Sequence, residues 1–460
     1  MKILLINTFW RVKEKHSIWK RVAGLTPPIG LMSIAAFLEK QGIEVDIIET
    51  NASEFDLSAF SKEFIQQYDF IGISATTNII NNAYTIIDYI KSLHPQSKII
   101  VGGVHATIMP EEVMQQKNVD FVITGEGEQV LYDFLRTNDI TKVPHVFYRN
   151  KGKVAFTHHS NHFVDIDTLP IPAYHKIDFT NYSLAPGSYK RLPGIGVVVS
   201  RGCPSLCTFC HGPLLGRNVR IRSVENIIQE IKLLRDTYHL KEIAFYDDNF
   251  TVYKQHTLEF CQRLIDEDID ITWSCFSKVT LVDEELLSIM KKAGCHQILY
   301  GIESGDPAIL KNIKKYISLE RIEQVIKLTK KHHIDVRAAF MLGNPGETEE
   351  TIKKTIEFAI KLNPDRAIFN ITTPFPGTEM YAWAHEHAFL LTTEWDKYDL
   401  SRPVMELPTV SSDTIMKYYM LSYRKFYFRL RYIMSQLVLL RNWRSFFTYV
   451  KIAIKLLYYT

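Results

Sequence analysis

The feature that most constrains the fold is an alternation of short apolar runs with helix-like stretches over the first 140 residues. The apolar runs are 2–6, 44–48, 70–74, 98–101 and 121–124, and the helix-like stretches are 28–41, 81–93 and 110–116. Strand and helix alternating at this spacing are typical of a parallel doubly wound sheet. Such a sheet binds its ligand at the carboxyl ends of its strands. We therefore expect an α/β domain of flavodoxin-like type over residues 1–140.

A second alternating series covers residues 194–390. Its apolar runs are 196–200, 242–246, 272–276, 297–300, 335–340 and 366–372, with helix-like stretches at 223–238, 283–293, 319–331 and 349–361. Six strands with intervening helices predict a parallel sheet curled into a partial (β/α)6 barrel, with function at the strands' carboxyl ends. Recurring prolines across 141–193 predict an extended linker. Residues 391–460 are expected to form a helical C-terminal region.

Three of the six cysteines form a C-x3-C-x2-C motif after the first strand of the second series: Cys203, Cys207 and Cys210. An iron–sulfur cube has four irons and usually takes four cysteines, so three thiols would leave one iron open. A structural zinc site is an alternative, but it wants four ligands and His211 is awkwardly placed to be the fourth. The C-x-x-C-H haem motif at 207–211 would normally require an export signal, which the interrupted apolar start does not predict. A disulfide is disfavoured in a cytosolic chain, and the other three cysteines suit the core.

Polar residues and glycines gather where the later strands of the second series end. The cysteine motif, with Phe209 just before its last cysteine, and these strand-end residues together resemble the radical S-adenosylmethionine enzymes. The resemblance implies a [4Fe–4S] cluster on the three cysteines and S-adenosylmethionine on its open iron. It implies contacts to S-adenosylmethionine from Phe209, Asp247, Asp248, Glu303, Ser304, Phe340 and Gly343. Two adjacent acids would also suit a helix start, and the segment after Phe340 would also suit a plain Pro-Gly turn.

The strand ends of the first series, together with the segment 27–31, resemble the cobalamin-binding domain that precedes the radical domain in one class of these enzymes. The implied cobalamin contacts are Ser74, Thr76, Gly102, Gly103, His105, Gly125, Glu126 and Gly127. Many such domains carry D-x-H-x-x-G, whose histidine ligates cobalt, but residues 7–11 of this chain read Asn-Thr-Phe-Trp-Arg. His16, His105, water or no ligand are the alternatives for the lower face of the cobalt.

The C-terminal segment is basic, although the net charge of the chain is only +3. Residues 411–460 carry nine Lys or Arg against one acid, interleaved with aromatic rings. This pattern suits an anionic membrane surface, nucleic acid, or a helical layer packed on the barrel, and nucleic acid is the least favoured. No apolar run reaches the roughly 18 residues that span a bilayer. We expect a cytoplasmic protein, with peripheral contact to the inner membrane face through residues 411–460 as a hypothesis.

The resemblance implies a cobalamin-dependent radical S-adenosylmethionine enzyme that takes electrons from a donor of flavodoxin or ferredoxin type. The leading hypothesis is C-methylation of an unactivated carbon in a small or lipid-like substrate. One alternative is a cyclisation, ring contraction or oxidation in which cobalamin transfers no methyl group. A cobalamin-binding sensor without catalysis and a zinc-containing nucleic-acid binder are alternatives from other classes.

Overall fold

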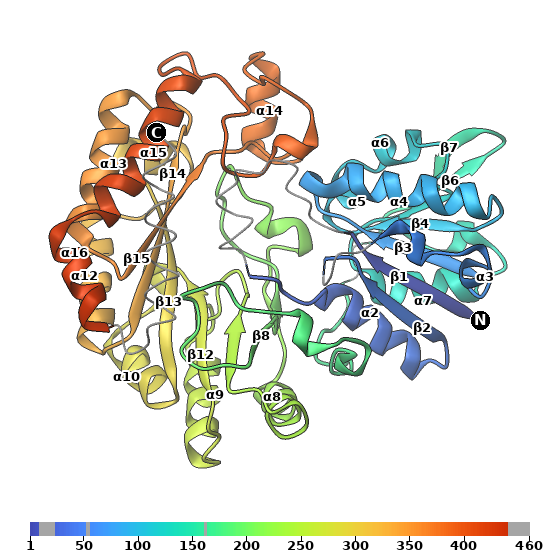
Figure 1. The fold of residues 1–460 in the computed structure, drawn as a ribbon, viewed down its shortest axis with the longest axis horizontal. Helices are drawn as coiled ribbons and strands as arrows, with labels where there is room; N and C mark the ends of the chain where they lie inside the picture. Colours follow the sequence, from blue (N-terminus) through green and yellow to red (C-terminus); the bar gives the residue numbers. More distant parts are fainter. Residues whose placement is uncertain (9–23, 52–55, 161–162, 440–460) are drawn as a thin grey trace.

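Two sheets, built mostly of parallel strands, lie side by side in the computed structural model, which describes residues 1–8, 24–51, 56–160 and 163–439 (Figure 1). The first sheet has the order β2-β1-β3-β4-β5-β6-β7, and the second has the order β15-β14-β13-β12-β11-β8. Both were predicted from the alternating series, and the α/β fold class is confirmed.

The first sheet begins with five parallel strands: β1 (Lys2–Asn7), β2 (Glu44–Glu49), β3 (Phe70–Ser74), β4 (Ile99–Gly102) and β5 (Phe121–Ile123). Two antiparallel strands, β6 (Val146–Asn150) and β7 (Lys153–Phe156), extend it beyond residue 140. Part of the predicted linker is therefore a hairpin of this sheet. Its strands are short, and the turn between them includes Lys151 and Gly152 with positive φ, so the sequence resembles a loop.

Helices cover both faces of the first sheet, and its strands are therefore buried on both sides. Ile3 and Leu5 pack with α2 (Ile29–Lys40) and α7 (Gly127–Arg136) on one face. Leu4 and Ile6 point to the other face. There they pack with α4 (Ile80–Leu93), α6 (Pro110–Gln115) and the short α3 (Lys62–Ile65) and α5 (Val104–Ile108). This is the predicted doubly wound arrangement.

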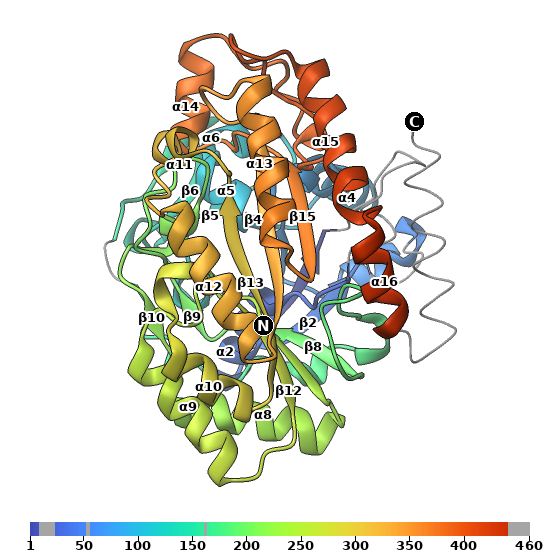
Figure 2. The same cartoon turned by 90° about the vertical axis from the view of Figure 1, so that its left-hand side faces the viewer.

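The second sheet curls into the predicted partial barrel. Its parallel strands are β8 (Gly194–Val197), β11 (Glu242–Phe245), β12 (Thr272–Ser277), β13 (Cys295–Glu303), β14 (Asp335–Leu342) and β15 (Arg366–Ile371). The helices along its outside are α8 (Val224–Tyr238), α9 (Lys254–Asp266), α10 (Glu284–Lys292), α11 (Pro307–Asn312), α12 (Leu319–Lys331) and α13 (Glu349–Leu362) (Figure 2). A short ribbon, β9 (Ser200–Arg201) with β10 (Arg220–Ile221), closes the base of the cysteine loop.

The barrel strands are followed by α14 (Glu379–Glu386), and the C-terminal region then packs on the barrel through α15 (Ser412–Tyr427) and α16 (Leu430–Leu439). Tyrosine hydroxyls of this region bond to the free edge of β15. The Tyr423 hydroxyl accepts from Phe369 N at 3.2 Å and donates to its carbonyl at 2.9 Å. Tyr427 does the same with Ala367, at 3.2 and 2.7 Å. The tyrosines thus satisfy backbone groups that an edge strand would otherwise expose.

The aromatic rings of this region are therefore part of a helical layer on the barrel, as one of the alternatives predicted. Residues 440–460 lie outside the described residues, so the basic tail is covered only in part. Among the helices that the structure describes, none combines the length and the apolarity needed to cross a membrane.

The rest of the predicted linker runs between the two sheets and is bonded to both. Asp167 Oδ1 accepts from the backbone N of Ser223, the residue that caps α8, at 2.7 Å. Ala173 N donates to the Met32 carbonyl of α2 at 3.0 Å. These contacts agree with an extended connector that fixes one sheet against the other.

Candidate active site between the two sheets

The carboxyl ends of the two sheets border one cavity of about 580 Å³. The first sheet contributes most of the strand-end residues predicted to contact cobalamin: Ser74, Gly102, Gly103, Gly125, Glu126 and Gly127. The second sheet contributes residues 198–202, 210–212 and 246–248. The volume is in the range of cofactor sites, and both sheets supply its walls.

Glycines expose the backbone at several points of the cavity wall on the first sheet, among apolar side chains such as Leu31 and Ile123. Gly103 has φ +93°, and a Cβ there would lie 2.7 Å from Ser74 Oγ, so no larger residue fits. Gly125 has φ +78°, and a Cβ there would meet nothing within 4 Å. Backbone exposed in this way lets a large flat group approach closely. These residues fit a corrin ring.

Two of the residues predicted to contact cobalamin lie outside this cavity. His105 is fully buried; its Nδ1 lies 3.2 Å from Thr77 Oγ1 and its Nε2 lies 3.0 Å from Glu112 Oε2. Both ring nitrogens are thus engaged inside the packed layer behind β4, away from the cavity. Thr76 is exposed and donates to Asn78 Oδ1 at 2.8 Å. His16 lies outside the described residues.

The three motif cysteines border a second, smaller cavity of about 180 Å³. Asn249 Nδ2 donates to Cys203 Sγ and Gly212 N donates to Cys210 Sγ, each at 3.3 Å. All six cysteines of the chain are free. The described part of the chain has no group of three His, Cys, Asp or Glu side chains suited to a single metal ion. Three thiols around a space of this size, with donors to two of the sulfurs, fit a [4Fe–4S] cluster.

Burial disfavours the thiolate form of two of the three motif cysteines, Cys207 and Cys210. Burial raises the pKa of Cys210 to about 11, and it also raises the pKa of Cys207. The positive charges of Lys315 and Lys278 lower the pKa of Cys207 and so oppose the effect of burial. Because thiolates are the ligands of iron, cluster binding must release protons from these groups.

Three of the residues predicted to contact S-adenosylmethionine also line the smaller cavity: Phe209, Asp248 and Glu303. Glu303 has φ +70° and its Oε1 lies 2.8 Å from Lys315 Nζ. Lys315 and Lys278 line the same cavity, although neither belongs to a recognisable sequence motif. The cavity therefore combines three thiols with two acids and two lysines.

Asp247 accepts hydrogen bonds from the residues that come just before the cysteine loop. Its Oδ1 accepts from Val199 N at 3.0 Å and from Ser200 Oγ at 2.5 Å. Burial raises the pKa of Asp247 to about 6. The residue borders the larger cavity, whereas the neighbouring Asp248 borders both cavities.

The remaining residues predicted to contact S-adenosylmethionine line neither cavity. Ser304 is fully buried, with its Oγ 3.1 Å from Thr355 Oγ1. Phe340 lies in the hydrophobic core, its ring stacked on Phe369 at 5.3 Å. Gly343 belongs to a turn in which its N donates to Glu347 Oε2 at 2.5 Å. In this structure these residues serve packing and turn formation.

The two cavities have Cys210, Gly212 and Asp248 in common as lining residues. His211 lies between Cys210 and Gly212 and faces the larger cavity, and its buried Nε2 has no hydrogen-bond partner. The sequence had offered His211 only as a poorly placed zinc ligand. One wall thus separates the thiol-lined space from the space between the sheets.

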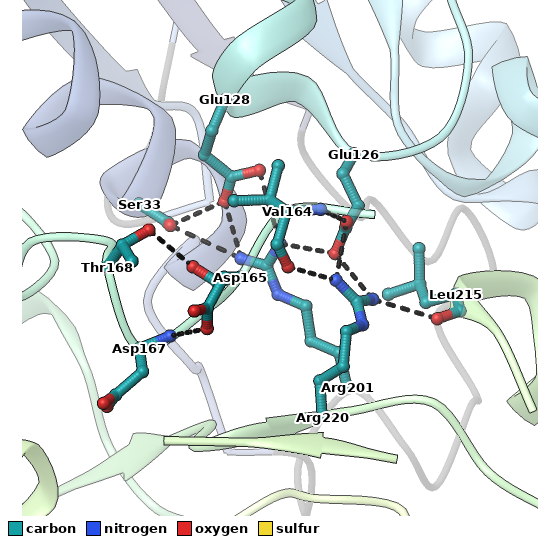
Figure 3. Close-up of polar contacts among 10 residues, drawn as sticks. All are labelled: Ser33, Glu126, Glu128, Val164, Asp165, Asp167, Thr168, Arg201, Leu215 and Arg220. Carbon is teal, nitrogen blue, oxygen red and sulfur yellow. Dashed lines mark hydrogen bonds and ion pairs between the residues drawn. The ribbon is translucent and has the colours of Figure 1, made fainter. Parts of the chain in front are cut away.

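Four charged side chains join the start of α7 on the first sheet to the ribbon of β9 and β10 (Figure 3). Arg201 contacts Glu126 at 2.8 Å and Glu128 at 2.6 Å, and Arg220 contacts Glu126 at 2.8 Å. Burial alone would raise the pKa of Glu128, but Arg201 and Ser33 outweigh burial and lower it. Glu126 therefore borders the larger cavity while its carboxylate binds the cysteine-loop ribbon.

Comparison with known proteins agrees with both halves of this site. Residues 16–135 match the family model described as B12 binding domain, and residues 197–359 match the Radical SAM superfamily model. An uncharacterized methyltransferase of Pyrococcus horikoshii is 35% identical over 438 residues, which cover 93% of each chain. An anaerobic magnesium-protoporphyrin IX monomethyl ester cyclase of Rubrivivax gelatinosus is 27% identical over 442 residues, covering 93% of this chain and 77% of the relative.

The fold also matches a solved structure of a cobalamin-dependent S-adenosylmethionine radical enzyme, OxsB, with a TM-score of 0.74 and 17% identity. The match covers 99% of this chain and 72% of OxsB. The chain belongs to the radical S-adenosylmethionine enzymes that carry a B12-binding domain. The cofactors that go with these two domains are a [4Fe–4S] cluster, S-adenosylmethionine and cobalamin.

Proposed function

We propose that this enzyme methylates an unactivated carbon of a small or lipid-like substrate. The observation that carries the proposal is the wall of Cys210, Gly212 and Asp248 common to the two cavities. A methyl donor and a radical generator must act on one substrate, and the residues suited to each border adjoining spaces. The methyltransferase of Pyrococcus horikoshii, which matches over nearly its whole length, supports the same reaction class.

The residues have distinct roles in this proposal. Cys203, Cys207 and Cys210 hold the cluster, with Asn249 donating to one of the sulfurs. Phe209, Asp248 and Glu303 border the place of S-adenosylmethionine. The corrin ring is received by the strand ends of the first sheet: Ser74, Gly102, Gly103, Gly125 and Gly127. When bound, these cofactors supply one-electron chemistry and methyl transfer, while the protein orients them and excludes water.

The two products of S-adenosylmethionine distinguish methylation from the alternatives. Methyl transfer leaves S-adenosylhomocysteine, whereas reductive cleavage leaves 5′-deoxyadenosine and methionine. The reconstituted holoenzyme is incubated anaerobically with S-adenosylmethionine and a chemical reductant, and both products are quantified. We expect both. Formation of 5′-deoxyadenosine alone would replace methylation with a cyclisation or other rearrangement, the reaction type of the Rubrivivax gelatinosus relative. Formation of neither would favour a sensor without catalysis.

The partners remain proposals. The one-electron reductant is of flavodoxin or ferredoxin type, because the cluster must be reduced before S-adenosylmethionine is cleaved. The membrane contact is proposed for residues 411–460, within which the hydroxyls of Tyr423 and Tyr427 bond to β15 while Leu430 is exposed. Liposome sedimentation with and without residues 440–460 tests whether that part of the segment carries the contact.

A further inference from the structure

The cysteine loop is closed at its base by two facing arginines. Arg201 on β9 and Arg220 on β10 are direct partners in the antiparallel ribbon, and residues 202–219 form the loop between them. Like charges directly opposite each other across two strands are destabilising on their own. The ribbon therefore depends on an anionic group from elsewhere in the molecule.

Glu126 of the first sheet supplies that group. Its Oε1 accepts from Arg201 Nη1 at 2.8 Å and from Arg220 Nη2 at 2.9 Å, and its Oε2 accepts from Arg220 Nη1 at 2.8 Å. Glu128 Oε1 accepts from Arg201 Nη2 at 2.6 Å. The two carboxylate side chains are only 6% and 3% exposed, so salt screens these contacts little. Figure 3 shows both guanidinium groups reaching from the ribbon to the two carboxylates.

The same carboxylates are fixed to the wall of the larger cavity. Glu126 is the N-cap residue of α7 and Glu128 lies in its first turn, where the helix dipole favours negative charge. Gly125 and Gly127, on either side of Glu126, line the cavity that fits the corrin ring. Gly202 and Cys203 directly follow Arg201. One carboxylate thus joins the turn beside one cofactor to the loop that holds the other.

We propose that Glu126, acting through Arg201 and Arg220, is a positioning residue that holds the turn 125–127 and the cysteine loop in fixed register. The proposal rests on the proposed function, because only transfer between the two cofactor sites requires that register. Cleavage of S-adenosylmethionine at the cluster does not require it. A misplacement of about 1 Å can slow a reaction about a hundredfold.

The first test compares two products in the Glu126→Gln and Arg220→Gln holoenzymes. The initial rate of 5′-deoxyadenosine formation is expected to stay within about twofold of the unmodified enzyme, while the initial rate of S-adenosylhomocysteine formation falls about ten- to a hundredfold. The double variant, Glu126→Gln with Arg220→Gln, is expected to form S-adenosylhomocysteine no more slowly than the slower single variant. Both substitutions remove the same Glu126–Arg220 contact, so their effects do not add. Arg263→Gln is the matched control, since Arg263 is half-buried and pairs with Glu267 at 2.6 Å and Glu225 at 3.0 Å, and it lines neither cavity. It is expected to change neither product.

The second test measures the register itself. A nitroxide is attached at Lys327→Cys, an exposed position of α12, and pulsed electron paramagnetic resonance gives its distances to cob(II)alamin in the holoenzyme. We expect a narrow distance distribution in the unmodified enzyme and in Arg263→Gln, and a broader or displaced one in Glu126→Gln. Arg220→Lys keeps the charge but loses the forked contact, so it provides an intermediate variant if Glu126→Gln does not fold.

Unchanged distances together with an unchanged product ratio would overturn the proposal. A parallel fall of both products at unchanged distances would also overturn it, because Glu126 would then merely support the cysteine loop. Failure of the proposed function has a different signature. In that case the unmodified enzyme forms no S-adenosylhomocysteine, and the distance distributions alone decide whether Glu126 positions the two sites.

Discussion

Replacing Lys315 by Met should destabilise the barrel more than any surface charge change, because it leaves Glu303 buried without its partner. The Lys315–Glu303 pair has a 2.8 Å contact, and each side chain is 9% exposed. Removing one member of a buried ion pair costs about 3–5 kcal/mol. Glu303 also holds φ +70°, a left-handed conformation unusual for a residue with a side chain. We expect Lys315→Met to lose about 3–5 kcal/mol of unfolding free energy at pH 8.

Urea unfolding of the full chain measures this loss. Lys254→Met is the control, because Lys254 pairs with Asp283 at 2.7 Å with both side chains about half exposed, and such surface pairs contribute less than about 1 kcal/mol. The double variant Glu303→Gln with Lys315→Met should recover most of the loss, since no buried charge remains. A loss for Lys315→Met no larger than that for Lys254→Met would refute the reasoning.

Three further outcomes follow from the same structure. Cys210→Ser should abolish stoichiometric iron binding, whereas Cys261→Ala, in the barrel core, should retain about four irons per chain by metal analysis; equal iron content in both variants would contradict the assignment. The rate of cluster assembly, measured as iron uptake, should be higher at pH 9 than at pH 7. Burial raises the pKa of Cys207 and Cys210, and only thiolates bind iron, so a rate independent of pH would contradict this step. Tyr427→Phe should cost about 1 kcal/mol and speed hydrogen exchange at Ala367, whose edge it caps; unaltered exchange would argue against the cap.

The two sheets could be predicted from the sequence because buried parallel strands form continuous apolar runs between helical stretches. The runs at 70–74 and 319–331 match β3 and α12 at both ends. The hairpin of β6 and β7 could not be predicted in the same way. Its strands are short and partly exposed, so they carry little apolar signal, and only tertiary pairing with β5 shows that they belong to the sheet.

The site was predictable where its residues are adjacent in sequence, and less so where topology brings them together. The cysteine motif is local, and all three thiols line one cavity. The resemblance implied that Phe340 contacts S-adenosylmethionine; in the structure its ring is stacked on Phe369 in the core, and that contact stays a prediction. Lys315 and Arg220 reach the site from elements without any motif. The contact roles of the remaining predicted residues stay predictions.

The central claim is that cluster and corrin ring occupy two adjoining spaces with a common wall of Cys210, Gly212 and Asp248. Crystals of the anaerobically prepared holoenzyme, measured at the iron and cobalt absorption edges, locate both metals directly. We predict an iron peak beside Cys203, Cys207 and Cys210 and a cobalt peak in the cavity between the sheets. Cobalt on the far side of the first sheet, or iron away from the three cysteines, would contradict the claim.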